Sequence, residues 1–266
     1  MHPSKLKYEH IFGLHTVKHV FENDISRVVE LWTQQTKQSK QKQHDGKLQD
    51  LLKQAQQQGI VIQTVPKKTL DKLTENQHHQ GIVIRCKARP INTQSNLETI
   101  LLNLNQPPFL LILDEVQDPH NLGACLRTAD AAGIHAVIVP KNRACSLSPI
   151  VHKVASGAAD TVPLIQVTNL VSTLRWLQEQ GIWIIGTDDD TQTSLFDTPL
   201  TGPLALVLGA EGTGLRRLTR ENCDALVSIP MLGKVESLNV SVATGVCLFE
   251  AIRQRQPIVQ KTPASI

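Results

Sequence analysis

The sequence predicts an α/β protein with two domains, a small α/β module at residues 1–88 and a larger, doubly wound parallel-sheet domain at residues 109–266. From Phe109 onward, short runs that are apolar on both faces alternate with helical stretches, which is typical of a parallel sheet covered by helices. The net charge also differs in sign between the two parts of the chain. Residues 1–90 carry 15 Lys and Arg against 8 Asp and Glu, whereas residues 91–266 carry 12 Lys and Arg against 16 Asp and Glu. The first part is therefore suited to a polyanion, although a solvated lysine-rich surface explains the charge equally well.

The first module alternates between helical and strand-like segments. Residues Ile11–Glu22 place apolar side chains at helical spacing, and Ile25–Trp32 is short and rich in β-branched residues. Between Gln34 and Gln58, ten of the 25 residues are Gln and five are Lys, which predicts a polar loop running into a helix near Lys47–Gln58. Two further strands, each opened by a glycine, are expected at Gly59–Val65 and Gly81–Lys87.

Residues 89–108 are rich in Pro, Asn, Ser and Gln, and they predict a linker with a short helix at Leu97–Leu104. The strands expected beyond the linker are FLLILDEV, HAVIVP, VPLIQV, IWIIGT, LALVLGA and ALVSIP. The helices expected between and after them are Leu122–Ala132, Pro149–Gly157, Leu170–Gln180, Leu215–Asn222 and Val240–Gln254. Ser148 and Asn169 are placed to cap two of these helices. In such a fold, ligands bind beyond the carboxyl ends of the strands.

Cysteine usage and hydropathy narrow the class of protein. The five cysteines are an odd number without C-x-x-C spacing, which argues against a disulfide framework and against a zinc site. No apolar run approaches the ~18 residues of a membrane span, and the first residues lack the apolar core of a signal peptide. We therefore expect a reduced, cytoplasmic protein that uses neither a membrane nor a metal.

The first block with chemistry-bearing residues, DPHNLGACLRTADAAG, follows the first strand of the larger domain. Asn121 is placed either to cap the next helix or to contact a ligand. Arg127 lies in a helix otherwise made of small apolar residues, so it is either paired structurally or directed at an anionic ligand. Its planar guanidinium suits bidentate contact with a phosphate.

The second block, LVLGAEGTGL, sets Glu211 among glycines after a late strand. Its spacing is G-x-x-G-x-G, which differs from the G-x-G-x-x-G dinucleotide fingerprint, and it lies outside the first βαβ unit. The glycines permit tight backbone close to a flat ligand. Glu211 is expected to point into a site, with a solvated loop carboxylate as the alternative.

The third block, SIPMLGKVESLNVSVATGVCLFEA, joins the last strand to the terminal helix. Ser237 and Asn239 are expected to cap that helix, a role compatible with ligand contact. Ser237, Ser241 and Gly245 repeat at i, i+4 and i+8, and such a stripe of small residues lets another backbone approach closely.

Together and in this order, the three blocks resemble the signature motifs of the SpoU family, RNA ribose 2'-O-methyltransferases that use S-adenosyl-L-methionine. The resemblance implies a SPOUT-type domain with a C-terminal trefoil knot, and a homodimer formed through this C-terminal domain. It implies catalytic roles for Asn121, Arg127, Glu211, Ser237 and Asn239. It also implies that the methyl donor is held by backbone groups at Gly209, Ile229 and Leu238.

The resemblance extends from Asp118 to about Arg253 and is strongest toward the family members that methylate a guanosine ribose in bacterial 23S rRNA during ribosome biogenesis. The segments IFGLHTV and HQGIVIRCK are similar to the substrate-binding module of those enzymes, which has the fold of small RNA-binding ribosomal proteins. Trp32–Lys53 departs from that pattern because it is richer in Gln and Lys.

Three other functions remain open at this point. A tRNA ribose 2'-O-methyltransferase of the same family is the nearest one, although such enzymes typically lack the N-terminal module. A non-enzymatic rRNA-binding assembly factor is supported by the basic first part. A nicotinamide-dependent oxidoreductase has only the glycines and the acidic Thr187–Asp190 in its favour.

Methyl transfer to a 2'-hydroxyl requires removal of a proton from a weak acid. The usual proposal for the family makes the motif arginine the base, yet a neutral guanidinium costs roughly 8 kcal/mol at neutral pH. We therefore expect Arg127 to hold the RNA phosphate and to stabilise the developing alkoxide, with the proton passing to that phosphate or to water. Glu211 would orient Arg127 or help hold the RNA, and Ser237 and Asn239 would position the ribose and the adjoining loop.

Overall fold

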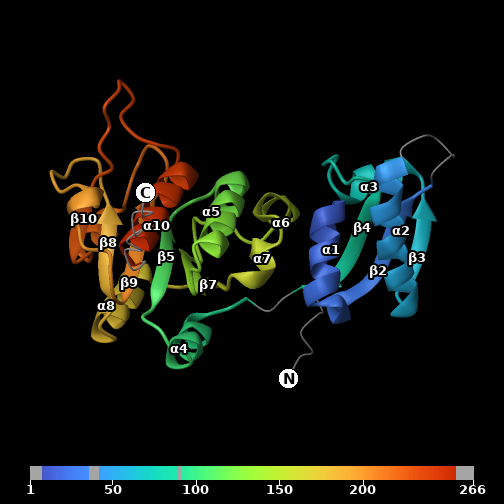
Figure 1. Ribbon diagram of the computed structural model, residues 1–266, viewed down its shortest axis with the longest axis horizontal. Helices are drawn as coiled ribbons and strands as arrows, with labels where there is room; N and C mark the ends of the chain where they lie inside the picture. The colour runs from blue at the N-terminus through green and yellow to red at the C-terminus, as the bar shows by residue number, and fades with distance from the viewer. Residues whose placement is uncertain (1–7, 36–41, 89–90, 256–266) are drawn as a thin grey trace, which may run out of the picture. The chain divides into compact units, whose positions relative to one another are not determined.

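The computed structural model describes residues 8–35, 42–88 and 91–255 (Figure 1). The chain forms two compact units, one made of residues 1–91, 122–127 and 146–161, the other of residues 92–121, 128–145 and 162–266. Each unit contains one β-sheet, and the strands of the two sheets fall before residue 88 and after residue 108 respectively. The domain boundaries at residues 88 and 109 stay a prediction.

The sheet of the first unit has the strand order β1-β4-β2-β3. Its strands are β1 (Tyr8–Phe12), β2 (Val28–Gln34), β3 (Val61–Val65) and β4 (Ile82–Lys87). β4 is antiparallel to both β1 and β2, and β2 is parallel to β3. Helices α1 (Leu14–Asn23) and α2 (Lys42–Gln57) pack on one face of the sheet, where side chains such as Ile11, Leu31 and Ile84 are fully buried.

The expected helix from Ile11 was wrong at its start. Ile11 and Phe12 belong to β1, and the helix begins only at Leu14. Gly13 separates the two elements with a φ of 92°, a left-handed conformation that favours glycine. Ile11 and Phe12 then lie in different core clusters on opposite faces of the sheet, as the two-residue period of a strand requires.

Two further elements of the first unit differ from the sequence expectation. Helix α2 begins at Lys42, before the expected Lys47, while residues 36–41 of the expected polar loop lie outside the described residues. Helix α3 (Lys67–Leu73) was not expected; its Leu70 packs on Phe12 and Val83. A 3-10 turn, η1 (Ile25–Arg27), precedes β2.

The second unit contains the doubly wound parallel sheet, in the order β10-β8-β9-β5-β6-β7, and every pairing in it is parallel. The six expected strands are confirmed as β5 (Phe109–Asp114), β6 (Ala136–Pro140), β7 (Leu164–Val167), β8 (Trp183–Thr187), β9 (Leu204–Gly209) and β10 (Ala225–Val227). All six side chains of β5 are buried, as expected for a strand covered on both faces.

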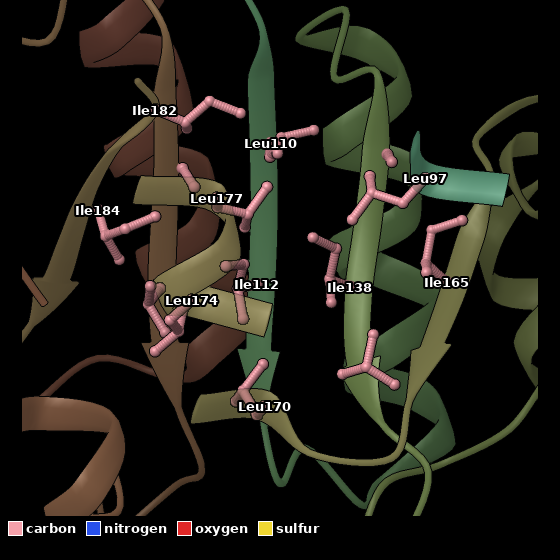
Figure 2. Packing of buried hydrophobic residues seen from close by; sticks show 14 residues of the cluster. Leu97, Leu110, Ile112, Ile138, Ile165, Leu170, Leu174, Leu177, Ile182 and Ile184 are labelled. Atoms are coloured by element: carbon pink, nitrogen blue, oxygen red, sulfur yellow. The ribbon is translucent and has the colours of Figure 1, made fainter. Parts of the chain in front are cut away.

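One face of this sheet is covered by α4 (Gln94–Leu102) and α8 (Leu170–Glu179). Figure 2 shows Leu170, Leu174 and Leu177 of α8 beside the side chains of the strands. Helices α6 (Pro149–Ala155) and α7 (Ala158–Thr161) belong to the first unit. The remaining helices of the chain are α5 (Pro119–Ala131), α9 (Arg217–Glu221) and α10 (Val240–Arg255), with a 3-10 turn η2 (Leu195–Asp197). Ser148 and Asn169 cap α6 and α8 as expected.

The cysteines lie buried or half-buried in the fold. All five cysteines are free thiols, and Cys125 and Cys247 are buried without exposed area. Burial raises the pKa of the Cys247 thiol to about 12, so this side chain is an inert part of the core. In the part of the chain that the structure describes, no helix has the length and apolar character needed to cross a membrane.

Candidate active site

A cavity of about 600 Å³ lies at the edge of the second sheet where its parallel strands end. Segments that follow three neighbouring strands line it, together with the start of α10. The lining residues are Thr187 at the end of β8 and Asp188, Asp189 and Asp190 after it, Leu208 to Leu215 around the end of β9, Arg220 of α9, Ile229 and Met231 after β10, and Glu236, Ser237, Leu238, Val240 and Ala243 around the start of α10. The volume is in the range of about 300–1,000 Å³ that is usual for small-molecule and cofactor sites.

The glycines of the second block shape the loop after β9. A Cβ atom on Gly209 would lie 2.1 Å from the carbonyl carbon of Gly214, so no other residue fits there without moving the backbone. The amide of Gly214 donates to the carbonyl of Ala210 at 2.9 Å, and Gly212 and Gly214 have φ angles of 77° and 63°. The loop therefore folds tightly back on the strand and leaves its backbone against the cavity, as the sequence predicts.

Three of the expected catalytic side chains, one from each block, are joined by hydrogen bonds. Asn239 Nδ2 donates to Asn121 Oδ1 at 3.0 Å and also to Glu211 Oε1. Asn239 Oδ1 accepts from the backbone amide and the hydroxyl of Ser241, at 3.0 and 2.5 Å. The amide of Asn239 thus makes all four hydrogen bonds open to it and fixes Asn121 and Glu211 in one arrangement.

The expected caps are partly wrong. Asn239 caps α10, but Ser237 lies two residues earlier, where it is exposed and lines the cavity. Asn121 does not cap α5, because Asp118 accepts from the amide of His120 at 2.8 Å and Pro119 occupies the first helical position. The buried side chain of Asn121 is therefore available for Asn239.

Five of the eight expected site residues line the cavity, whereas Asn121, Arg127 and Asn239 do not. Gly209, Ile229 and Leu238 all line the cavity, and so do Glu211 and Ser237. Arg127 is exposed on α5, and within the described residues the hydrogen bonds of Asn239 do not include it. Gly245 of the small-residue stripe faces α5, since a Cβ there would lie 3.9 Å from the methyl group of Thr128.

An ion pair beside the loop, between the buried Asp114 and the partly exposed Arg216, was missed by the sequence reasoning. Asp114, with no exposed area at the end of β5, accepts from the backbone amide of Arg216 at 3.1 Å and from its Nε at 2.8 Å. Glu115, in a left-handed conformation with φ 65°, lies 3.3 Å from the same guanidinium. These contacts fix the far end of the β9 loop to the neighbouring strand. The acidic end of an otherwise apolar run was the only signal in the sequence.

Three consecutive aspartates give the cavity a negative wall. Asp188 pairs with Arg220 at 2.6 Å, and Asp189 and Asp190 also line the cavity. Burial, followed by repulsion from Asp188 and Asp190, raises the pKa of Asp189. The sequence reasoning had connected these residues only with a nicotinamide site, whereas the structure places them beside the glycine loop.

Two family models match the chain in the order of its two sheets. Residues 10–91 match the model described as RNA 2'-O ribose methyltransferase substrate binding, and residues 108–249 match the SpoU rRNA Methylase family. The chain belongs to the SpoU rRNA methylase family. As the resemblance predicted, this SpoU methylase has an α/β fold in two parts. Residues of the second and third blocks line the cavity, and the first block is linked to the third through the hydrogen bond between Asn121 and Asn239.

Relatives of this SpoU methylase are similar over nearly their whole length. The 23S rRNA (guanosine-2'-O-)-methyltransferase RlmB of Shewanella oneidensis is 53% identical over 250 residues, which cover 94% of this chain and 99% of the relative. RlmB of Escherichia coli is 51% identical over 247 residues, which cover 93% of this chain and 99% of the relative.

Solved structures share the fold. The SpoU methyltransferase AviRb from Streptomyces viridochromogenes, in complex with the cofactor AdoMet, superposes with a TM-score of 0.74 at 24% identity, over 93% of this chain and 90% of that one. The A. aeolicus TrmH/SpoU tRNA modifying enzyme superposes with a TM-score of 0.52 at 30% identity, over only 60% of this chain and 83% of that one.

Within the described residues, no group of three or more His, Cys, Asp or Glu side chains is arranged to hold a metal ion.

Proposed function

We propose that this SpoU methylase transfers a methyl group from S-adenosyl-L-methionine to the ribose 2'-hydroxyl of a guanosine in 23S rRNA. The observation that carries the proposal is the identity of 51 to 53% with proteins named for that reaction, over both the substrate-binding and the methylase parts. A relative that keeps the catalytic part but acts on another RNA would be expected to differ in the first part. The tRNA modifying enzyme named above covers only 60% of this chain.

The cavity fits the methyl donor in size, backbone and charge. Its volume of about 600 Å³ suits a nucleoside-sized ligand, and Gly209, Ile229 and Leu238 offer backbone groups to it. The donor carries a sulfonium and an ammonium against one carboxylate, and Asp188–Asp190, Glu211 and Glu236 give the wall the opposite charge. When bound, the sulfonium supplies an electrophilic methyl group.

In this proposal, the side chains of the three blocks bind the RNA, stabilise the developing alkoxide and position the ribose. Arg127 would hold an RNA phosphate through its planar fork and stabilise the alkoxide that develops on the 2'-oxygen. The proton would pass to that phosphate or to water. Asn239 would keep Asn121 and Glu211 in place through the hydrogen bonds described above, and Ser237, which is exposed at the cavity, would position the ribose.

A homodimer formed through the C-terminal domain, with α10 at or beside the interface, is also part of the proposal. Val242 and Phe249 lie seven residues apart on one side of α10, and they are 52% and 50% exposed. Apolar side chains of this size at the surface suit an interface with a second copy. The C-terminal trefoil knot and a cytoplasmic location are proposed on the basis of family membership.

The test uses the protein with tritium-labelled methyl donor and two RNA pools, purified 23S rRNA and tRNA. We expect label in 23S rRNA, recovered after digestion as 2'-O-methylguanosine. Label in tRNA alone would favour the tRNA methyltransferase. If equilibrium dialysis detected no binding of the methyl donor, the assembly-factor function would replace the proposal.

A further inference from the structure

We propose that the face of the first unit's sheet opposite α1 and α2 binds single-stranded RNA, with bases stacking on Tyr8 and Trp32 and with Arg85 and Lys87 contacting phosphates. This inference deepens the proposed function, on which it rests, because it names the surface that takes the substrate's unpaired bases. It assigns a role to aromatic side chains that the methyl-transfer site does not use.

The register of the sheet puts these residues on one face. In strands β1 and β4, His10 pairs with Arg85 and Tyr8 pairs with Lys87, while in β2 and β4 Trp32 pairs with Val83. Paired residues share a face, and alternate residues along a strand point to opposite faces. Ile11, Leu31 and Ile84 point to the face that α1 and α2 cover.

Helix α3 covers one end of this second face, where Leu70 packs on Phe12 and Val83, and the half-buried Trp32 packs against the same cluster. The rest is open to solvent: Tyr8 is 47% exposed and the side chain of Arg85 is 38% exposed. Lys87 and Gln63 are exposed on the same face.

Aromatic rings and a guanidinium gather on this open face in a chain that is poor in aromatics, at 3% of its residues. The guanidinium carbon of Arg85 lies 5.1 Å from the ring centroid of Tyr8, the only tyrosine, and 5.7 Å from that of Trp32. His10 meets Trp32 edge to face, with 5.5 Å between ring centroids. Proteins bind unpaired bases on such surfaces, because every base has a flat face that stacks on an aromatic ring or a guanidinium.

Glu30 holds this group of side chains in place. Its Oε2 lies 2.9 Å from Nη2 of Arg85, and its Oε1 accepts from Nε2 of Gln63. Burial, and then the charge of Arg85, lower the pKa of His10, while Glu30 opposes the shift. His10 is thus a neutral ring at pH 7, and the rings and the guanidinium are positioned before any ligand arrives.

The charge and the chemistry of the face favour RNA over a protein partner. Residues 1–90 carry the surplus of Lys and Arg, and Arg85 and Lys87 are on the face itself. Among the described residues, Glu30 is the acidic side chain paired into this group, and it is 11% exposed and covered by Arg85. A protein interface would be expected to present an aliphatic centre, whereas Val61, at the edge strand, is the large exposed aliphatic side chain of the described part of this sheet.

The first experiment measures binding of the full chain to a fluorescein-labelled, 12-nucleotide single-stranded RNA by anisotropy at fixed salt. We expect Tyr8→Ala to weaken binding at least about fivefold, because stacking of one base is lost. Tyr8→Phe keeps the ring and should bind within about twofold of the wild type. Phe196→Ala is the matched control, since it removes an aromatic ring that is 49% exposed on η2 of the second unit, and it should leave the affinity unchanged.

The second experiment asks whether a base reaches Trp32 directly. In a Trp176→Phe, Trp183→Phe double variant, Trp32 is the only tryptophan, and saturating RNA should quench its fluorescence. Absence of quenching together with wild-type affinity in Tyr8→Ala would overturn the inference.

Methyl transfer and donor binding are measured on the same proteins to keep the two proposals apart. If 23S rRNA is methylated but neither Tyr8→Ala nor the quenching shows an effect, the sheet face is wrong and the proposed function stands. If RNA binding depends on Tyr8 and Trp32 but no RNA accepts a methyl group, the proposed function is wrong and the binding surface stands.

Discussion

At the scale of single residues, Asn239 connects the fold of the site to its chemistry. One amide both caps α10 and joins Asn121 to Glu211. We expect Asn239→Ala to destabilise the protein by about 1 kcal/mol through the lost cap and to lower methyl transfer at least tenfold. Thermal melting and labelled-methyl transfer measure the two effects.

Asn239→Asp separates the two roles. An aspartate still caps the helix, so stability should stay close to that of the wild type. It cannot donate to Asn121, and it places a carboxylate against Glu211, so methyl transfer should fall as in the alanine variant. Normal turnover in Asn239→Asp would show that the link between Asn121 and Glu211 is unnecessary.

Arg127 is proposed to act on the substrate alone. Both Arg127→Ala and Arg127→Lys should lose most of the methyl transfer and keep donor binding, because lysine retains the charge but lacks the planar fork. Turnover and equilibrium dialysis of the methyl donor are the two measurements. Near-normal turnover in Arg127→Lys would exclude bidentate phosphate contact as the role of this side chain.

A substitution at Gly209 tests whether the loop after β9 shapes the donor site. In Gly209→Ala the new methyl group would collide with the backbone of Gly214, so the loop must move and donor binding should fall at least tenfold. Gly233→Ala is the matched control, because a Cβ there meets no atom within 4 Å and the φ angle is not left-handed. Equal donor affinity in the two variants, measured by calorimetry, would mean that the loop is not part of the donor site.

The residue scale also shows what sequence could and could not predict about the site. The glycine spacing and the three blocks pointed to Gly209, Glu211 and Asn239 because a motif keeps its residues together in the chain. The contact of Asp114 with Arg216 joins residues that are 102 positions apart. Such a pair depends on which strands become neighbours, which the order of motifs does not reveal.

At the scale of elements, α10 has one side that packs in the core and one side that is exposed. Its buried side packs on β9, and its outer side exposes Val242 and Phe249. If this side forms the dimer, Phe249→Glu should shift the protein toward monomer at micromolar concentration, because a charge would have to be buried in an apolar contact. Sedimentation velocity gives the mass, and Phe196→Glu, a charge placed at another exposed ring, is the control. A wild-type monomer with full activity would contradict the proposed dimer.

The elements themselves were predictable where the apolar pattern had a single interpretation. The six strands of the parallel sheet are continuous apolar runs, and all were found. In the first unit, Ile11 and Phe12 fit a helical spacing as well as a strand, and only their burial on opposite faces of the sheet decides for the strand. Helix α3 has seven residues and little apolar content, so its sequence gave no comparable signal.

At the scale of the whole molecule, the surplus positive charge of residues 1–90 should govern the affinity for RNA. Lys67, Lys68 and Lys72 are exposed on α3, and changing all three to Gln removes up to three phosphate contacts. The slope of log affinity against log salt on single-stranded RNA should then fall by about 2, at about 0.7 for each contact. An unchanged slope, measured by anisotropy between low and physiological salt, would mean that these lysines are only solvated. Donor binding should be unaffected in either case.

The position of β5 in the sheet has a consequence for biosynthesis. β5 is flanked by β6, which follows it closely, and by β9, whose Leu204 pairs with Phe109 of β5. A ribosome that adds ~5–20 residues per second has therefore released β5 seconds before its second neighbour exists. Until then, a strand that is apolar on both faces has one edge unpaired, the state most open to aggregation. Synthesis rate and chaperone supply should thus control the yield of soluble enzyme more strongly than its final stability does.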